Sequence, residues 1–233
     1  MKYLKFGIGI IFFGFLVSSI CLARGDEIKP AKFYEDGKDF LSKIDFPEKS
    51  FEGTVVVRGA ADISKGGLST ALVFYTDTKN RDIFKPYEDA IRKAFGPRIK
   101  VLPATVNGKR KRVWINFSVV FEKNQEQNSI NIYQNLLYNT NSYGNNYIDP
   151  QRFVLGRFPD ACRKNRYGEG SMVWLAANID ENGIPSNSRI VTGEASGGCK
   201  RKLIELLSKS SFIPAQYEGK FVSATYVEVW FTY

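Results

Sequence analysis

Four acidic side chains near a predicted second hairpin are the residues best placed for proton-transfer chemistry. They are Asp160, Glu169, Asp180 and Glu181. General acid-base catalysis needs carboxyls held in a pocket, and carboxyls at a turn give no sign of one. The chain contains no histidine, which excludes Ser-His-Asp and Cys-His catalysis and every metal site with a histidine ligand. The sequence therefore predicts a protein that is not an enzyme, with no catalytic residue, metal or cofactor.

Three cysteines are too few for a cysteine-rich metal cluster, but two of them suit a disulfide. Cys21 lies in an apolar N-terminal segment and leaves with it if that segment is cleaved. Cys162 and Cys199 then remain as an even pair in an exported chain, which favours a disulfide between them. Two separate buried thiols are the alternative. A catalytic dithiol is disfavoured because the chain has no C-x-x-C motif.

Basic side chains outnumber acidic ones, and the formal net charge is +9. Such a balance can attract nucleic acid, an anionic membrane or an acidic protein. The densest basic run is Lys109-Arg110-Lys111-Arg112. Alternate residues of an extended chain face opposite sides, so this run makes a poor continuous patch. We therefore predict no nucleic-acid partner and interpret the run as a solvated turn and strand start.

The N-terminal 23 residues are typical of an export signal. A short basic segment, 1–5, precedes an uncharged, apolar run over 6–23 that ends in small residues. An uncleaved inner-membrane anchor is the alternative, because the run lies near the lower limit for spanning a bilayer. Ile20 is too large for a lipidation signal at Cys21. Both interpretations place the rest of the chain outside the cytoplasm, in an oxidising compartment, with membrane contact only if the segment stays uncleaved.

The elements that would position these residues occur twice, in the order strand, strand, helix, strand. The predicted strands are 54–60, 68–75 and 112–121 in the first copy, and 171–179, 188–192 and 227–233 in the second. Gly66-Gly67 and Asn182-Gly183 join the first two strands of each copy as a hairpin. Pro103-Ala104 and Gly108-Lys109 recur as Pro214-Ala215 and Gly219-Lys220. The matching order indicates an internal duplication.

Each copy also carries one helix with an apolar stripe. The stripe is Tyr87, Ile91, Ala94 and Phe95 in the first copy, and Cys199, Leu203, Leu206 and Leu207 in the second. Pro86 is expected in the first turn of the first helix, and Gly96-Pro97 ends it. We therefore predict an α+β fold of two tandem β-β-α-β modules. Each module is a small antiparallel three-stranded sheet with a helix packed on one face.

The predicted domain organisation has four parts. They are a signal peptide or anchor over 1–23, a first module over 24–121, a linker over 122–151 and a second module over 152–233. The linker is rich in Asn and Gln with scattered tyrosines, and a short helical turn around 132–138 is its only expected structure. Its tyrosines could stack on bases or sugars, but we favour a soluble spacer.

The motifs of the second copy, taken in order, resemble the C-terminal domain of TonB, the periplasmic energy transducer. They are Phe158-Pro159, Gly170, Ile179-Asp180-Glu181-Asn182-Gly183, the helix from Cys199 to Lys209, Phe212-Ile213-Pro214-Ala215, Gly219-Lys220 and the strand from Val227 to Tyr233. The resemblance covers 157–233, and 46–121 is a weaker version of it. The periplasmic domain of TolA is a related alternative.

The resemblance implies a protein-binding module. In this family the segment before the aromatic-Pro motif and the edge of the last strand capture a short peptide of an outer-membrane receptor by strand pairing. Carried over by position, the partner-binding residues are Arg157, Phe158, Pro159, Val227, Val229 and Phe231. The expected partner is an outer-membrane TonB-dependent receptor or another envelope protein. Phe158, Val229 and Phe231 could instead belong to the core.

The chain departs from a complete TonB in two respects. It has no histidine to couple to a membrane motor, and its nine prolines are dispersed rather than gathered in one long span. We therefore expect binding without force transmission. The alternative function is a structural or assembly protein of the cell envelope. In that case the two modules pair edge to edge, or the chain forms homo-oligomers through its sheet edges.

Overall fold

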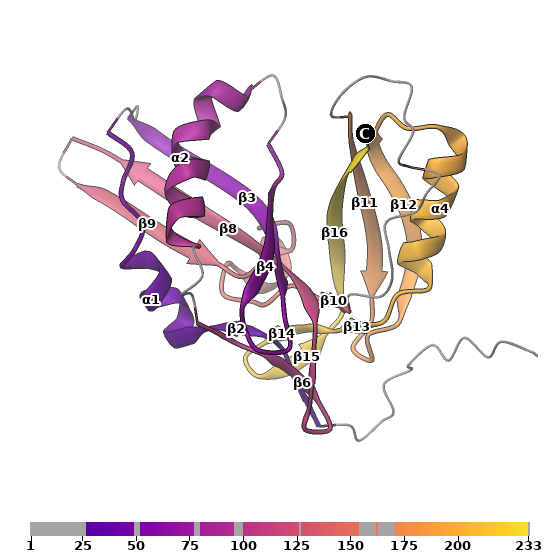
Figure 1. The fold of residues 1–233 in the computed structure, drawn as a ribbon. Helices are drawn as coiled ribbons and strands as arrows, with labels where there is room; N and C mark the ends of the chain where they lie inside the picture. Colours follow the sequence, from indigo (N-terminus) through magenta and orange to yellow (C-terminus); the bar gives the residue numbers. More distant parts are fainter. Residues whose placement is uncertain are drawn as a thin grey trace, which may run out of the picture.

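The chain folds as a mixed α+β protein built mostly of antiparallel sheets (Figure 1). The structure is a computed structural model that describes residues 27–48, 52–76, 80–95, 100–125, 127–153, 162 and 171–232. The helical segments among them are η1 (Tyr34–Gly37), α1 (Lys38–Leu41), α2 (Arg81–Ala94), α3 (Thr140–Tyr143) and α4 (Gly197–Ser208). A first half, which ends near residue 133, and a second half, which begins at residue 171, lie side by side in Figure 1.

The larger sheet has the strand order β13-β10-β8-β3-β4, with β9 also pairing with β8. These strands are β3 (Gly53–Ile63), β4 (Ser69–Phe74), β8 (Val113–Lys123), β9 (Asn128–Tyr133), β10 (Gln151–Phe153) and β13 (Phe212–Ile213). The predicted sheet of three strands is therefore too small. In addition, β13 comes from the second half of the chain, so this sheet joins the two halves.

The second half has a three-stranded sheet in the order β12-β11-β16. Its strands are β11 (Ser171–Ile179), β12 (Pro185–Gly193) and β16 (Ala224–Thr232). β11 has the predicted bounds, and β16 pairs with it from Ile179↔Ala224 to Ser171↔Thr232. The remaining strands are short: β1 (Ile28–Lys29), β2 (Lys32–Phe33), β5 (Val101–Leu102), β6 (Ala104–Val106), β7 (Lys109–Lys111), β14 (Ala215–Tyr217) and β15 (Lys220–Val222).

The apolar stripe of α2 covers one face of the larger sheet, as its period predicts. Tyr87, Ile91, Ala94 and Phe95 are all buried there, against alternate residues of β3 and β8. The helix begins at Arg81, earlier than expected, so Pro86 lies inside it rather than in its first turn. Proline lacks the N–H that would bond to the fourth preceding carbonyl, but a single missing bond near the helix start is tolerated when the stripe is buried.

The helix α4 covers one face of the second sheet in the same way. Cys199, Leu203 and Leu207 are buried against β11 and β16, while Leu206 is only partly buried. The opposite face of this sheet is buried as well, because it packs against the first half of the chain. That second interface was not predicted, and it determines what the last strand can do.

The segment predicted to be a linker is instead part of the fold. Its strand β9 pairs with β8 from Ser118↔Tyr133 to Lys123↔Asn128. Ile130 and Ile132 alternate with polar residues and pack on the larger core, so β9 has a period of two. The Asn-rich composition masked this short alternation. The expected helical turn around 132–138 is absent from the described residues, and a short helix lies at Thr140–Tyr143.

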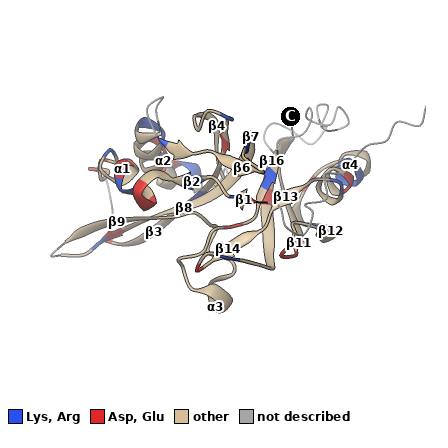
Figure 2. Cartoon of the chain, turned by 90° about the horizontal axis from the view of Figure 1, so that it is seen from below, with Lys and Arg blue, Asp and Glu red and all other residues tan. Residues whose placement is uncertain are grey.

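Charged side chains of both signs lie along α1 and α4 (Figure 2). The basic run at 109–112 is divided, because Arg112 pairs with the buried Asp62 through its Nε at 2.8 Å while Lys109 and Arg110 face solvent. Among the described residues, no helix is long and apolar enough to cross a membrane. The predicted signal segment, 1–23, lies outside the described residues.

Candidate functional site

Three predicted partner-binding residues, Val227, Val229 and Phe231, lie on the face of β16 that turns away from α4. Val227 and Val229 are buried against the first half of the chain, and Phe231 packs at the margin of the same cluster. The core alternative, which named Phe158, Val229 and Phe231, therefore holds for Val229. Phe231 is partly exposed. The predicted residues Arg157, Phe158 and Pro159 lie outside the described residues.

Side chains of the first half and of residues 134–149 cap the outer edge of β16. The Asn139 side chain bonds to the backbone of Thr225 as a neighbouring strand would. Its Nδ2 donates to Thr225 O at 3.1 Å, and its Oδ1 accepts from Thr225 N at 3.3 Å. Asn116 Nδ2 donates to Val227 O at 3.0 Å. An amide side chain presents the same donor and acceptor as a peptide group. The expectation of an open last-strand edge is therefore wrong between Thr225 and Val227.

A buried ion pair joins β10 of the larger sheet to β16 next to this edge. The guanidinium of Arg152 donates from Nε and Nη2 to the two oxygens of Glu228, each at 2.7 Å. The side chains are only 3% and 8% exposed. Tyr226 donates its hydroxyl to Glu228 Oε2 at 3.0 Å. Such a bidentate pair fixes the orientation of β10 relative to β16.

A second buried carboxyl, Asp149, lies close to the ion pair. Its Oδ2 accepts from Asn116 Nδ2 and from Leu136 N, each at 3.1 Å, whereas Oδ1 is buried and has no hydrogen-bond partner. Burial raises the pKa of Asp149 to about 7, although hydrogen bonds from Asn116, Tyr147 and the Leu136 N–H act in the opposite direction. This group is therefore poised to change its charge near neutral pH.

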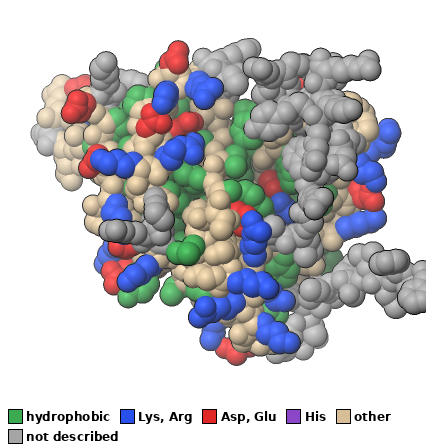
Figure 3. Space-filling view, in the orientation of Figure 1, with side chains coloured by type: hydrophobic (Ala, Val, Ile, Leu, Met, Phe, Trp, Pro, Cys, Tyr) green, Lys and Arg blue, Asp and Glu red, His purple; other side chains and the backbone are tan. Residues whose placement is uncertain are grey.

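An apolar cleft of about 220 Å³ opens between the two sheets. It lies beside the polar junction, by which we mean the contacts that Asn116, Asn139, Asp149, Arg152 and Glu228 make. Its lining residues are Ala60, Val73, Tyr75, Trp114, Glu228, Val229, Trp230 and Phe231. Figure 3 shows hydrophobic side chains gathered between the two halves on this face of the molecule. Two of the predicted partner-binding residues, Val229 and Phe231, line the cleft. The third tryptophan of the chain, Trp174, contacts the lining residue Tyr75 with a ring separation of 5.7 Å.

The acidic residues at the second hairpin stabilise turns. Asp180 Oδ1 accepts from Asn182 N at 3.0 Å and from Ile184 N at 2.8 Å, an arrangement that closes the hairpin loop. Glu181 accepts from Ser223 Oγ at 2.9 Å. The other two acids considered for catalysis, Asp160 and Glu169, lie outside the described residues.

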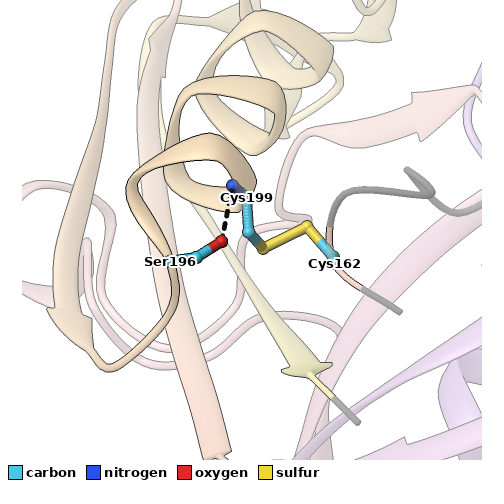
Figure 4. Close-up of a disulfide and its surroundings, with 3 residues drawn as sticks. All are labelled: Cys162, Ser196 and Cys199. Carbon is cyan, nitrogen blue, oxygen red and sulfur yellow. Dashed lines mark hydrogen bonds between the residues drawn. A yellow bond between two sulfur atoms is a disulfide. The ribbon is translucent and has the colours of Figure 1, made fainter. Parts of the chain in front are cut away.

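Cys162 and Cys199 are joined by a disulfide with a Cα–Cα distance of 4.8 Å (Figure 4). Cys199 lies in the first turn of α4, and its N–H donates to Ser196 Oγ, the N-cap, at 3.2 Å. Both cysteines are buried in the core beneath α4. The bond therefore attaches position 162 to the start of the helix.

Reduction of this disulfide is expected to lower the free energy of unfolding by about 4 kcal/mol, because the bond closes a loop with a sequence separation of 37. Urea unfolding with and without reductant measures the loss. The double variant Cys162→Ser/Cys199→Ser is the matched control and should not respond to reductant. A wild-type midpoint unchanged by reductant would contradict the prediction.

Sequence reasoning missed the polar residues that build this junction, namely Asn116, Asn139, Asp149, Arg152 and Glu228. One signal was present for Asn116, because it interrupts the apolar strand V-W-I-N-F on the face opposite Ile115 and Phe117. A polar residue inside a buried strand indicates that this face meets a polar partner. No local sequence pattern distinguishes the other four residues from residues on the protein surface.

Comparisons with known proteins do not assign the chain to a family. No protein-family model, no curated protein and no solved structure matches the chain.

Proposed function

We propose that the chain is a periplasmic protein-binding module related to the C-terminal domain of TonB, without enzymatic activity. The order and pairing of the main elements support this proposal. The succession β3, β4, α2, β8 has the same order as β11, β12, α4, β16, and in each set the first strand pairs with the second and the fourth. The shared order supports the interpretation of the sequence repeat as two β-β-α-β modules.

The apolar cleft is the observation that carries the proposal. Tyr75, Trp114 and Phe231 line it and pack in one apolar cluster, and aromatic residues are the commonest anchors of protein interfaces. We infer that an extended segment of an envelope protein, such as an outer-membrane receptor, inserts an apolar side chain between β16 and the first half. The predicted residues Val229 and Phe231 would contact that side chain.

Binding by this route differs from strand addition along the whole last strand. The N–H and C=O of Thr225 are already bonded to Asn139, and the C=O of Val227 to Asn116. A partner strand would have to displace both side chains before it could pair there. Side-chain insertion into the cleft needs no such displacement.

The structural alternative, an assembly protein, is favoured by a different observation. The buried Arg152–Glu228 pair and the capped β16 edge show that the halves serve as partners for each other. They do so through packed faces, through side chains and through the short β10–β13 pairing, in which a strand of the second half extends the larger sheet. Homo-oligomers would use β4 or β12, which end their sheets among the described strands. The register shifts in the β11–β12 pairing make β12 a poor edge for addition.

A photo-crosslinking residue at position 231 tests the cleft in envelope preparations. We expect one main adduct, identified by mass spectrometry as an outer-membrane receptor or other envelope protein. Val191, which is 57% exposed on β12, is the matched control position and should not give this adduct. Identical adducts from both positions, or none from position 231, would contradict the proposal.

The substitution Phe231→Ala should weaken binding of that captured partner by roughly tenfold or more, because a buried phenylalanine contributes about 1.5–3 kcal/mol of apolar burial. Titration monitored by tryptophan fluorescence measures the change, since Trp114 and Trp230 line the cleft. Val191→Ala is the control. Equal affinities for the two variants would place the partner elsewhere.

A further inference from the structure

A polar pocket of about 490 Å³ lies apart from the apolar cleft and shares no lining residue with it. Four segments of the chain meet there: Lys32 to Asp36, Ile132 to Gln134, Asn145 to Ile148 and Gln216 to Gly219. The first two belong to the first half, the third to the capping segment and the fourth to the β14–β15 hairpin. The pocket exists only in the assembled fold.

The walls of this pocket are fixed before any ligand arrives. Ile148 and Gln216 exchange two backbone hydrogen bonds of 2.9 and 3.0 Å. The Gln134 side chain accepts from Phe33 N at 3.2 Å and donates to Ala31 O. Tyr147 is 2% exposed. A pre-formed site loses little conformational freedom on binding.

Two acidic lining residues have a left-handed backbone conformation, which is unfavourable for one of them, Glu218. Asp36 has φ 51° and Glu218 has φ 49°, both in the left-handed region. The corresponding hairpin of the first half has Asn107 followed by Gly108, the favoured pair for such a turn. Glutamate does not share the tolerance of asparagine for this conformation. A strained residue that persists beside a pocket points to a role for its side chain in binding.

The lining chemistry indicates the class of ligand. Amides of Asn145, Asn146 and Gln216 both donate and accept hydrogen bonds, and the carboxylates of Asp36 and Glu218 accept them. Lys32 is the one cation among the described lining residues, so this lining does not suit a polyanion. A hydroxyl group both donates and accepts, which makes a polyol the matching partner. The half-buried ring of Tyr133 offers an apolar surface for the C–H face of a sugar ring.

We propose that this pocket binds a short neutral saccharide. The site does not depend on the proposed protein-binding function of the cleft. Its hydrogen bonds come from the amides and the two lining carboxylates, and the Tyr133 ring stacks against the sugar.

The test titrates the full exported chain with tri-N-acetylchitotriose and, separately, with maltotriose, followed by amide chemical shifts in ¹H–¹⁵N spectra. At least one probe should shift the side-chain amide signals of Asn146 and Gln216 in a saturable manner. Glu218→Asn should weaken this binding at least tenfold. The same substitution restores the favoured Asn-Gly turn, so its Tm should be unchanged or higher, which separates a binding defect from a folding defect.

Glu205→Gln removes a carboxylate from the outer face of α4 and is the matched control; it should bind the saccharide like the wild type. No saturable shift with either probe at 20 mM would overturn the proposal. Binding that survives Glu218→Asn would also overturn it. So would choline binding at these residues in place of both sugars, because the carboxylates would then form a cation site.

Discussion

Glu228→Ala is expected to lower the free energy of unfolding by about 3–5 kcal/mol. The substitution leaves the guanidinium of Arg152 buried without its carboxylate partner, and the hydroxyl of Tyr226 loses its acceptor as well. Breaking one side of a buried pair is severe because the remaining charge has neither water nor a counter-ion. Urea unfolding at pH 7, followed by tryptophan fluorescence, measures the loss.

Two further variants separate the buried charge from simple packing loss. The double substitution Arg152→Met/Glu228→Leu removes both charges and should recover most of the stability, because apolar replacements of similar volume fill the same space. Glu205→Ala breaks the exposed pairs to Lys202 and Lys209 and should change stability by less than about 1 kcal/mol. If Glu228→Ala behaved like Glu205→Ala, the pair would not hold the junction together.

The elements that could be predicted from the sequence are those with local signals. The stripe of α4 repeats with the helical period, so Cys199, Leu203 and Leu207 were correctly assigned to one buried face. The turn at Asn182-Gly183 fixed the β11–β12 hairpin, and β11 has its predicted bounds. Period and turn chemistry act over a few residues, and a single sequence carries them directly.

The elements that escaped prediction depend on contacts between distant segments. β10 and β13 are only 3 and 2 residues long, so neither carries a periodic pattern, and their pairing brings together residues about 60 positions apart. Asn139 caps Thr225 by its position in the fold, and an asparagine in an Asn-rich stretch looks like any surface residue. Tertiary context, not propensity, decides such cases.

The residues of the candidate site also divide into those that a local pattern predicts and those that only contacts between distant segments bring together. Val229 and Phe231 were placed on one face of the last strand by alternation, and that face lines the cleft. The polar contacts to β16 were not predicted, because Arg152 meets Glu228, and Asn116 joins Asp149 to Val227, only when distant segments of the chain pack together. These contacts also change what the TonB resemblance implies, because side chains of the same chain already occupy part of the edge of the last strand.

The unfolding free energy is expected to fall as pH rises from about 4 to about 7, because of Asp149. A pKa raised from 3.8 to about 7 means that the folded chain keeps a proton that the unfolded chain has already released. The contribution of the protonated carboxyl is therefore complete below pH 4 and is lost as pH rises through 7, which amounts to about 4 kcal/mol. The slope in this window is roughly 1.4 kcal/mol per pH unit.

Asp149→Asn isolates this contribution, because the amide keeps an oxygen that can accept from Asn116 and Leu136 but has no titrating proton. Urea unfolding of both proteins at intervals between pH 5 and pH 8 should show a slope for the wild type and a nearly flat line for the variant. The chain contains no histidine, so none titrates in this window, and the pKa of Glu205 is lowered to about 2, well below it. Parallel pH profiles for the two proteins would show that Asp149 is ionised in the fold at neutral pH. In that case a partner for its buried Oδ1, such as a trapped water molecule, would have to stabilise the charge at the junction.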